Sequence, residues 1–245
     1  MDLKERLAGD ERRHPWELAR ARSYRKLIAA HTNLAGVRSV LDIGAGDGWF
    51  ASDIRGDLAE PATVVCWDIN YRSEDLATPI GPGISRTRDR PVGPFDVVVA
   101  LDVLEHIASD EAFLADVIVP SIGPGGVGLL SVPAHPRLFS DHDRMLEHER
   151  RYRPAAFQAL VGRHLDVVAA GSLFSSLVPL RAVDVLRQKT GRAVEQTGVG
   201  SWSSGPRVTR AITAVLEADA AIGCGAARVG MPLPGLSTWT VVRRR

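Results

Sequence analysis

The chain has 245 residues, of which 45% are hydrophobic and 24% charged, with a formal net charge of +1. This is the composition of a globular protein with one sizeable core. The small net charge excludes a strongly positive overall electrostatic potential of the kind that attracts nucleic acid or an anionic membrane. Cys66 and Cys224 form no close-spaced pair, no apolar run is long enough for a membrane span, and the N-terminus is charged, so we expect no disulfide framework and a cytoplasmic location.

A helix is predicted near the start of the chain, over roughly residues 15–33. Pro15 suits a first helical turn, and no later residue of the segment breaks a helix. An apolar stripe with helical spacing is formed by Tyr24, Leu27, Ile28 and His31. Much of the remaining surface of this helix is basic, with Arg20, Arg22, Arg25 and Lys26. This pattern predicts a helix that lies on the domain with a basic outer face or, as an alternative, a helix that contacts a membrane surface or an acidic partner.

From residue 37 onward, short apolar strands alternate with helices. Strands are predicted at 37–43, 62–69, 95–102, 125–132, 165–174 and 237–245. Helices are predicted at 49–58, at 109–122 with Ser109 as N-cap, at 153–164, and later along a stripe of Val208, Ile212, Val215, Leu216 and Ile222. This alternation indicates a parallel sheet that is covered on both faces. An exposed loop is expected between Gln188 and Pro206, where glycine, serine and threonine are frequent.

A glycine-rich turn follows the first of these strands. Gly44, Gly46 and Gly48 lie in "LDIGAGDGWF", where glycine allows positive φ and a close approach of a ligand to the backbone. Such a turn at the carboxyl end of a parallel strand points N–H groups and a helix N-terminus at a ligand. Asp68 ends the next strand, 22 residues after Gly46, where a carboxylate can accept two hydrogen bonds from ribose hydroxyls. Together these features predict an adenosine site.

The pattern of the turn narrows the choice of cofactor. Trp49 stands where the G-x-G-x-x-G fingerprint of a dinucleotide site has its third glycine, and the chain lacks a G-x-x-x-x-G-K-[ST] phosphate loop. No tyrosine is followed four residues later by lysine, a pair expected in an oxidoreductase of this length. S-adenosyl-L-methionine carries no phosphate and fits an acidic turn that holds Asp42 and Asp47.

The motifs resemble those of the class I S-adenosylmethionine-dependent methyltransferases. "VLDIGAGDGWF" resembles the first motif, "VVCWDIN" the ribose-binding strand end, "FDVVVALDVLEHI" the fourth-strand motif and "GPGGVGLLSVP" the strand that follows, over roughly residues 37–133. "HPWELARAR", "SVPAHPRLFSDHDRMLEHERRY" and the C-terminal half resemble a bacterial subgroup that acts on small molecules, often near glycan or natural-product pathways.

This resemblance implies a set of residues that hold S-adenosyl-L-methionine and its product S-adenosyl-L-homocysteine. The methionine portion is assigned to Asp42, Gly44, Ala45 and Gly46, the ribose to Asp68 and Ile69, and the sulfonium side of the pocket to Leu101, Asp102 and Val103. Glu105 and His106 either point to the active site or cap the next helix. The family's leucine-proline pair before the fourth strand is absent from "ISRTRDRPVGPFD", which leaves Asp89 as the expected adenine contact.

The polar segment that follows the fifth strand is too long for a simple connector and lies where ligands bind. It carries His135, Asp141, His142, Asp143 and His148, with Arg150 and Arg151 available for an anionic substrate group. Three interpretations remain open: a lid held by salt bridges, a catalytic base supplied by His142, His148 or His106, and a metal bound by His142, Asp143 and His148. The ligand spacing matches no established metal site, so no metal is expected.

We therefore expect a single domain of the Rossmann-like α/β class, doubly wound, with a mostly parallel seven-strand sheet and an antiparallel C-terminal edge strand. It would comprise an N-terminal helical segment (1–36), a cofactor-binding core (37–133) and lid or substrate insertions (134–153 and about 175–235). The expected reaction is methyl transfer to oxygen, nitrogen or carbon of a small metabolite, with no nucleic acid as partner. The alternatives are another reaction of the same cofactor, such as intramolecular cyclisation, and cofactor binding without catalysis.

Overall fold

The structure is a computed structural model that describes residues 13–190 and 202–245. Within these ranges seven strands form one sheet with the order β3-β2-β1-β4-β5-β7-β6. The strands are β1 (Ser39–Ile43), β2 (Thr63–Trp67), β3 (Ile84–Thr87), β4 (Phe95–Leu101), β5 (Ile122–Pro133), β6 (Asp166–Leu173) and β7 (Ser237–Arg243). The first five pair in parallel, which confirms the predicted doubly wound α/β class.

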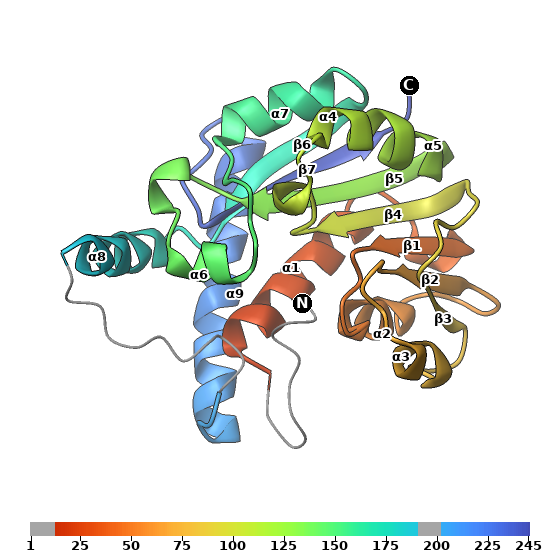
Figure 1. Cartoon of the computed structure of the whole chain (residues 1–245), viewed down its shortest axis with the longest axis horizontal. Helices are drawn as coiled ribbons and strands as arrows, with labels where there is room; N and C mark the ends of the chain where they lie inside the picture. The colour runs from red at the N-terminus through yellow and green to blue at the C-terminus, as the bar shows by residue number, and fades with distance from the viewer. Residues whose placement is uncertain (1–12, 191–201) are drawn as a thin grey trace.

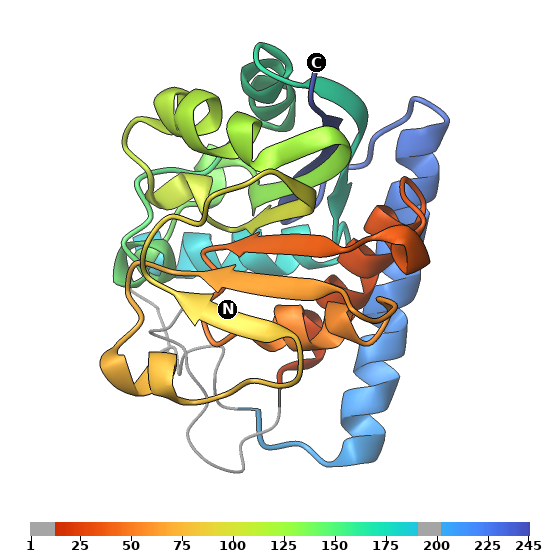
Figure 2. The same ribbon diagram turned by 90° about the vertical axis from the view of Figure 1, so that its right-hand side faces the viewer.

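Helices cover both faces of this sheet (Figures 1 and 2). One face packs against α1 (Pro15–Ala29), α2 (Trp49–Arg55) and α9 (Pro206–Arg228). The other packs against α7 (Pro154–Gly162) and a continuous helical stretch made of α4 (Asp110–Phe113), a π-helical turn (Leu114–Ile118) and α5 (Val119–Ser121). The remaining helices are α3 (Ser73–Ala77), α6 (Asp141–Met145) and α8 (Leu177–Lys189). None of the helices within the described ranges is long and apolar enough to cross a membrane.

The central strands are apolar on both faces because each face meets its own layer of helices. Val97 and Val99 of β4 belong to the core under α1 and α2, whereas Val98 and Ala100 belong to the core under α7. All four side chains are fully buried. Burial of a valine or leucine side chain stabilises a fold by roughly 1.5–3 kcal/mol, so this double core holds the carboxyl ends of the strands in fixed register.

The C-terminal strand β7 is antiparallel, as predicted, but it lies second from the edge. It pairs antiparallel with both β5 and β6, and β6 is the outermost strand. The first six residues of β7 are buried, whereas the first three residues of β6 are exposed. A strand that is buried on both sides needs a neighbour on each side, and the half-exposed β6 suits the edge.

The basic side chains on the outer face of α1 pair with acidic residues of the surrounding segments. Arg25 bonds both Asp53 and Asp57 at 3.0 and 2.5 Å, and Arg22 pairs with Glu217 of α9. The helix begins with a capping box in which Trp16 N–H donates to His14 Nδ1 and His14 N–H donates to a Glu17 carboxylate oxygen. The charged face of α1 therefore contacts acidic residues on and after α2 and on α9, while Arg22 and Lys26 also remain exposed to solvent.

The buried face of α9 also differs from the predicted stripe. Only Leu216 of the predicted set is buried, while Val208, Ile212, Val215 and Ile222 are exposed. The face that packs on the sheet consists mainly of small residues, namely Thr209, Thr213, Leu216, Ala220 and Gly223. A Cβ on Gly223 would lie 2.9 Å from the carbonyl oxygen of Ser172. Close packing against β6 therefore selects small side chains over large apolar ones.

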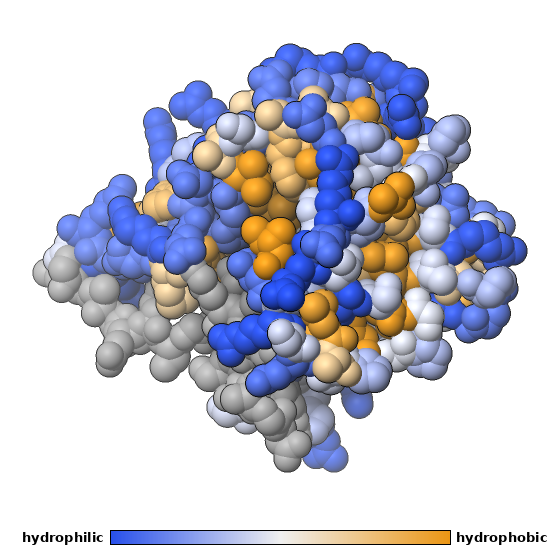
Figure 3. All heavy atoms as spheres, turned by 45° about the vertical axis from the view of Figure 1, so that its right-hand side comes forward, coloured by the Kyte–Doolittle hydropathy of each residue, from blue (hydrophilic) through white to orange (hydrophobic). Residues whose placement is uncertain are grey.

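Some elements fall outside the predicted ranges. Strand β3 and helices α3, α6 and α8 had not been assigned residue ranges, and most of the loop expected between Gln188 and Pro206 lies outside the described residues. Of the insertion expected near 175–235, α8 approaches the carboxyl end of the sheet, whereas α9 packs against α1 and β6. On the face shown in Figure 3, hydrophilic side chains surround the apolar ones that reach the surface.

Candidate active site

The glycine turn between β1 and α2 has the backbone conformation that its sequence predicts. Gly44, Gly46 and Gly48 have φ values of 65°, 55° and 78°. A Cβ on Gly44 would lie 2.6 Å from Cγ2 of Val103, and a Cβ on Gly48 would lie 2.4 Å from Cδ1 of Ile80. The positive φ favours glycine at both positions, and the contact with the β-branched Val103 adds a steric reason at Gly44.

Asp68 lies at the end of β2 and is fixed over this turn. Its Oδ2 accepts a hydrogen bond from the Gly46 N–H at 3.0 Å, and its Oδ1 accepts one from the Asn70 N–H at 2.9 Å. The Gly44 N–H donates to the carbonyl of Trp67 at 2.8 Å. Each carboxylate oxygen has a further lone pair, so Asp68 keeps capacity to accept hydrogen bonds from a ligand.

Asp42 lies in the buried base of the turn. Its side chain is 3% exposed, and its Oδ2 has no hydrogen-bond partner in the described part of the chain. Burial, together with the charges of Asp47 and Asp68, raises the pKa of Asp42 to about 7. An acidic group without a partner at this point fits a ligand that carries a positive charge.

A cavity of about 710 Å³ opens at the carboxyl ends of the strands. Its lining includes nine residues that the sequence analysis singled out: Gly44, Asp68, Ile69, Leu101, Asp102, Val103, His106, His142 and His148. Asp42, Ala45 and Gly46 are buried and do not line it, and Asp89 is exposed beyond the end of β3. One cavity thus contains both the expected cofactor residues and all three expected catalytic histidines.

Helix α1 contributes residues to this cavity that the sequence analysis did not assign. Trp16 and Arg20 line it, and the Arg20 guanidinium lies 4.0 Å from the centre of the Trp16 ring. Arg20 also forms an ion pair with Asp102, which follows β4 and has a φ of 56°. Trp16 and Arg20 are four residues apart, a spacing that places both on one face of α1. This spacing was the signal available in the sequence.

The segment between β5 and α7 is closed at its base and arches toward the cavity. The Tyr152 N–H donates to the carbonyl of Pro133 at 2.9 Å, and the His135 N–H donates to the carbonyl of Tyr152 at 2.8 Å. The Tyr152 hydroxyl donates to Asp110 Oδ2 at 2.7 Å, and its oxygen also lies 3.1 Å from the carbonyl oxygen of Leu104. These contacts fix both ends of the segment and place its histidines over the sheet.

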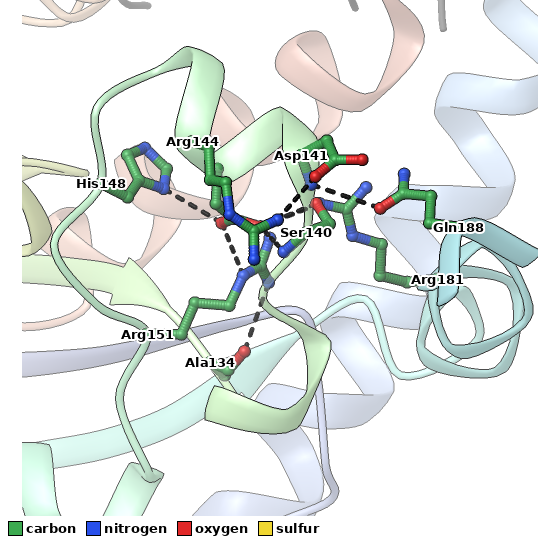
Figure 4. A network of polar contacts seen from close by, with 9 residues as sticks. Ala134, Ser140, Asp141, Arg144, His148, Arg151, Arg181 and Gln188 are labelled. Atoms are coloured by element: carbon green, nitrogen blue, oxygen red, sulfur yellow. Dashed lines mark hydrogen bonds and ion pairs between the residues drawn. The ribbon is translucent and has the colours of Figure 1, made fainter. Parts of the chain in front are cut away.

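Asp143 is the centre of the polar network that holds this segment, and Figure 4 labels four of its partners, Ser140, His148, Arg151 and Arg181. Its carboxylate accepts hydrogen bonds from the Ser140 N–H at 2.9 Å, Arg151 Nε at 2.7 Å and Arg181 at 3.2 Å, and it bonds His148 Nδ1 at 3.1 Å. Burial alone would raise the pKa of Asp143, but the bond to His148 and the charge of Arg151 hold it far below its usual range. Ion pairs with Asp143 therefore hold this segment in place.

The contacts of Asp143 and His142 bear on the two other interpretations of this segment, a metal site and a catalytic base. Both oxygens of Asp143 are engaged by protein donors, so the structure does not assemble the metal site considered for His142, Asp143 and His148. Burial and the charge of Arg181 lower the pKa of His142, which leaves its imidazole neutral at neutral pH. His142 can therefore accept a proton. Arg150 contacts Asp110 and the carbonyl of Ala108 and does not line the cavity.

The fold and the site together define a doubly wound α/β protein with a cavity at the carboxyl ends of its strands. Residues 10–175, more than half of the chain, match a family of methyltransferase domains. The chain therefore belongs to this family. Comparison with curated protein sequences gave no match.

Several solved structures share the fold at low sequence identity. An S-adenosylmethionine-dependent methyltransferase from Mesorhizobium loti is 16% identical, with 93% of this chain and 100% of that chain covered and a TM-score of 0.54. The N-methyltransferase NodS from Bradyrhizobium japonicum, in complex with S-adenosyl-L-homocysteine, is 18% identical, with coverages of 69% and 86% and a TM-score of 0.52. The [4+2]-cyclase SpnF is 16% identical, with coverages of 97% and 86% and a TM-score of 0.55.

Proposed function

We propose that this chain transfers a methyl group from S-adenosyl-L-methionine to a small-molecule acceptor. The observation that supports this proposal is that a single cavity is lined at one end by Gly44 and Asp68 and at the other by His142, His148 and Arg151. A donor held at the first end would face an acceptor held at the second. Family membership supports the same reaction class.

The residues at the first end fit this cofactor. Asp68 can accept hydrogen bonds from both ribose hydroxyls, and the side chain of Ile69, 71% exposed, offers an apolar edge beside it. The unpartnered oxygen of Asp42 lies below the turn on which the methionine portion would rest. When bound, the cofactor supplies a methyl group on a sulfonium, which is already electrophilic.

The protein's main task is then to orient the acceptor. Fixing two reactants in line can lower the barrier by about 7–11 kcal/mol. The ion pair between Arg20 and Asp102 holds α1 across the cavity, and the network of Asp143 holds the lid segment on the opposite side. If the acceptor atom is a hydroxyl oxygen, the neutral His142 accepts its proton, an effect worth on the order of 10²–10⁴ in rate.

Two arginines of the cavity wall could bind an acceptor with an anionic group. Arg151 and Arg181 both line the cavity and share the single buried carboxylate of Asp143. Glu147 and Glu149 also line the cavity, so the lid as a whole is not basic. A carboxylate or phosphate on the acceptor would bind through the guanidinium groups of Arg151 and Arg181. Natural-product, sugar and glycan-precursor acids are the class of metabolite that we propose.

Mass spectrometry of the products tests this proposal. The purified chain is incubated with S-adenosyl-L-methionine and a panel of anionic and neutral small acceptors. S-adenosyl-L-homocysteine together with an acceptor that is heavier by one methylene supports methyl transfer. Methylthioadenosine would indicate intramolecular cyclisation instead, and calorimetric binding of the cofactor without any product across the panel would favour a non-catalytic binding protein.

A further inference from the structure

Glu105 is a buried acid that no other part of the proposed function uses. It lies in the 3₁₀ turn Leu104–His106 after β4, and its side chain is fully buried. Neither of its carboxyl oxygens has a hydrogen-bond partner within the described ranges of the chain. A buried carboxyl group without partners is destabilising, so its retention calls for a ligand.

Two imidazoles lie next to this carboxyl group. One ligand atom from each of Glu105, His106 and His148 lies within 4.8 Å of the other two, and the rings of His106 and His148 meet edge to face at 4.7 Å. Ligand atoms on a tetrahedral zinc ion lie about 3.4 Å apart, so closure around an ion shortens each distance by at most about 1.4 Å. Side-chain rotations can supply a movement of this size.

His148 is already oriented as a metal ligand would be. Its Nδ1 bonds Oδ1 of Asp143, which leaves Nε2 as the atom available to an ion. A carboxylate that fixes the other nitrogen of the ring is the usual outer partner of a metal-bound histidine. Asp143 is itself held by Arg151 and Ser140, so the ring of His148 has a rigid support.

We propose that Glu105, His106 and His148 bind a divalent first-row transition-metal ion in the wall of the cavity. Two imidazoles and one carboxylate favour zinc and similar ions over magnesium or calcium. A nearby second acid strengthens the assignment, because Oδ1 of Asp102 is buried and also lacks a hydrogen-bond partner among the described residues. Oδ2 of Asp102 already pairs with Arg20, so a metal cation at this point would mainly offset the charge of Glu105.

The site has a direct consequence for the acceptor, and this part rests on the proposed function. His106 and His148 line the cavity, so the remaining coordination position of the ion opens toward the acceptor. An acceptor hydroxyl bound there is acidified by the ion and needs less help from a histidine base. The metal would thus select oxygen acceptors over carbon acceptors.

Cobalt binding tests the site without any assay of activity. The full chain is stripped with a chelator and titrated with Co²⁺ while its visible d–d absorption is recorded. We expect saturation at one equivalent, displacement by Zn²⁺, and a loss of affinity on the order of 100-fold in Glu105→Gln and in His106→Asn. His164→Asn is the matched control, because His164 also contacts a carboxylate, that of Glu111, but does not line the cavity. The Co²⁺ affinity of this variant should equal that of the parent.

Two results would overturn the metal site. One is a titration that does not saturate, or that saturates equally in Glu105→Gln and the parent. The other is an X-ray absorption spectrum of the zinc-loaded parent without imidazole scattering, a measurement that needs no variant and covers the case in which the variants fail to fold. Calorimetry with S-adenosyl-L-homocysteine on the same samples distinguishes the two proposals. If only the metal site is wrong, the chain still binds the cofactor product.

Discussion

The N–H of Gly46 donates a hydrogen bond of 3.0 Å to Oδ2 of Asp68, so the glycine turn and the strand-end acid form one unit. Asp68→Ala removes this acceptor and the proposed contacts to the ribose. We expect the affinity for S-adenosyl-L-homocysteine to fall at least tenfold in isothermal calorimetry. Unchanged affinity would contradict the ribose assignment.

The adenine contact predicted for Asp89 can be tested in the same experiment. Asp89 is exposed and does not line the cavity, so Asp89→Ala should change the affinity by less than about twofold (a difference of about 0.4 kcal/mol). A loss as large as that of Asp68→Ala would instead place the adenine against Asp89.

Gly44→Ala should destabilise the fold through two separate effects. The residue has a φ of 65°, and its new Cβ would lie 2.6 Å from Val103. Gly125→Ala is the matched control, because Gly125 has a φ of 75° but open space around its Cβ position. The unfavourable φ alone costs about 1–2 kcal/mol. Urea unfolding should therefore show a clearly larger loss for Gly44→Ala, and equal losses would mean that the Val103 contact relaxes freely.

The Arg20–Asp102 pair should matter more for stability than the pair of the neighbouring Arg22 with Glu217. The side chain of Arg20 is 12% exposed, whereas that of Arg22 is 51% exposed. Arg20→Met leaves Asp102 without its cation and should cost on the order of 3 kcal/mol. Arg22→Met should cost about 0–1 kcal/mol. Similar losses in chemical denaturation would show that α1 is not held by the Arg20 contact.

Asp42 should make the stability of the protein fall as the pH rises. Its folded-state pKa, about 7, lies above its ordinary value of 3.8 because the side chain is buried. The protonated group therefore favours folding below pH 4, and this contribution is lost as the pH rises from about 4 to about 7. The loss in the free energy of unfolding is up to about 4 kcal/mol. Asp42→Asn should reduce this slope, measured as the free energy of unfolding at several pH values. A parallel decline in both proteins would exclude Asp42 as the cause.

The cofactor end of the site could be predicted from the sequence because its determinants are local. A glycine turn after an apolar strand and an acid at the end of the next strand are brought together by a single βα unit. The register between β1 and β2 follows from that unit, with Ile43 opposite Trp67, the residue before Asp68. The parallel sheet could be predicted for the same reason, since alternating apolar strands and helices can bury their faces in few other ways.

The acceptor end was decided only by the tertiary structure. Arg20 meets Asp102 across 82 residues of sequence, and His148 meets Glu105 through a loop whose path depends on contacts of Tyr152, Asp143 and Arg181. The exposed apolar stripe of α9 and the interior position of β7 were likewise set by packing between distant segments. Spacing along the chain encodes the period of a helix or strand, but it does not encode which side chains from separate elements share a cavity.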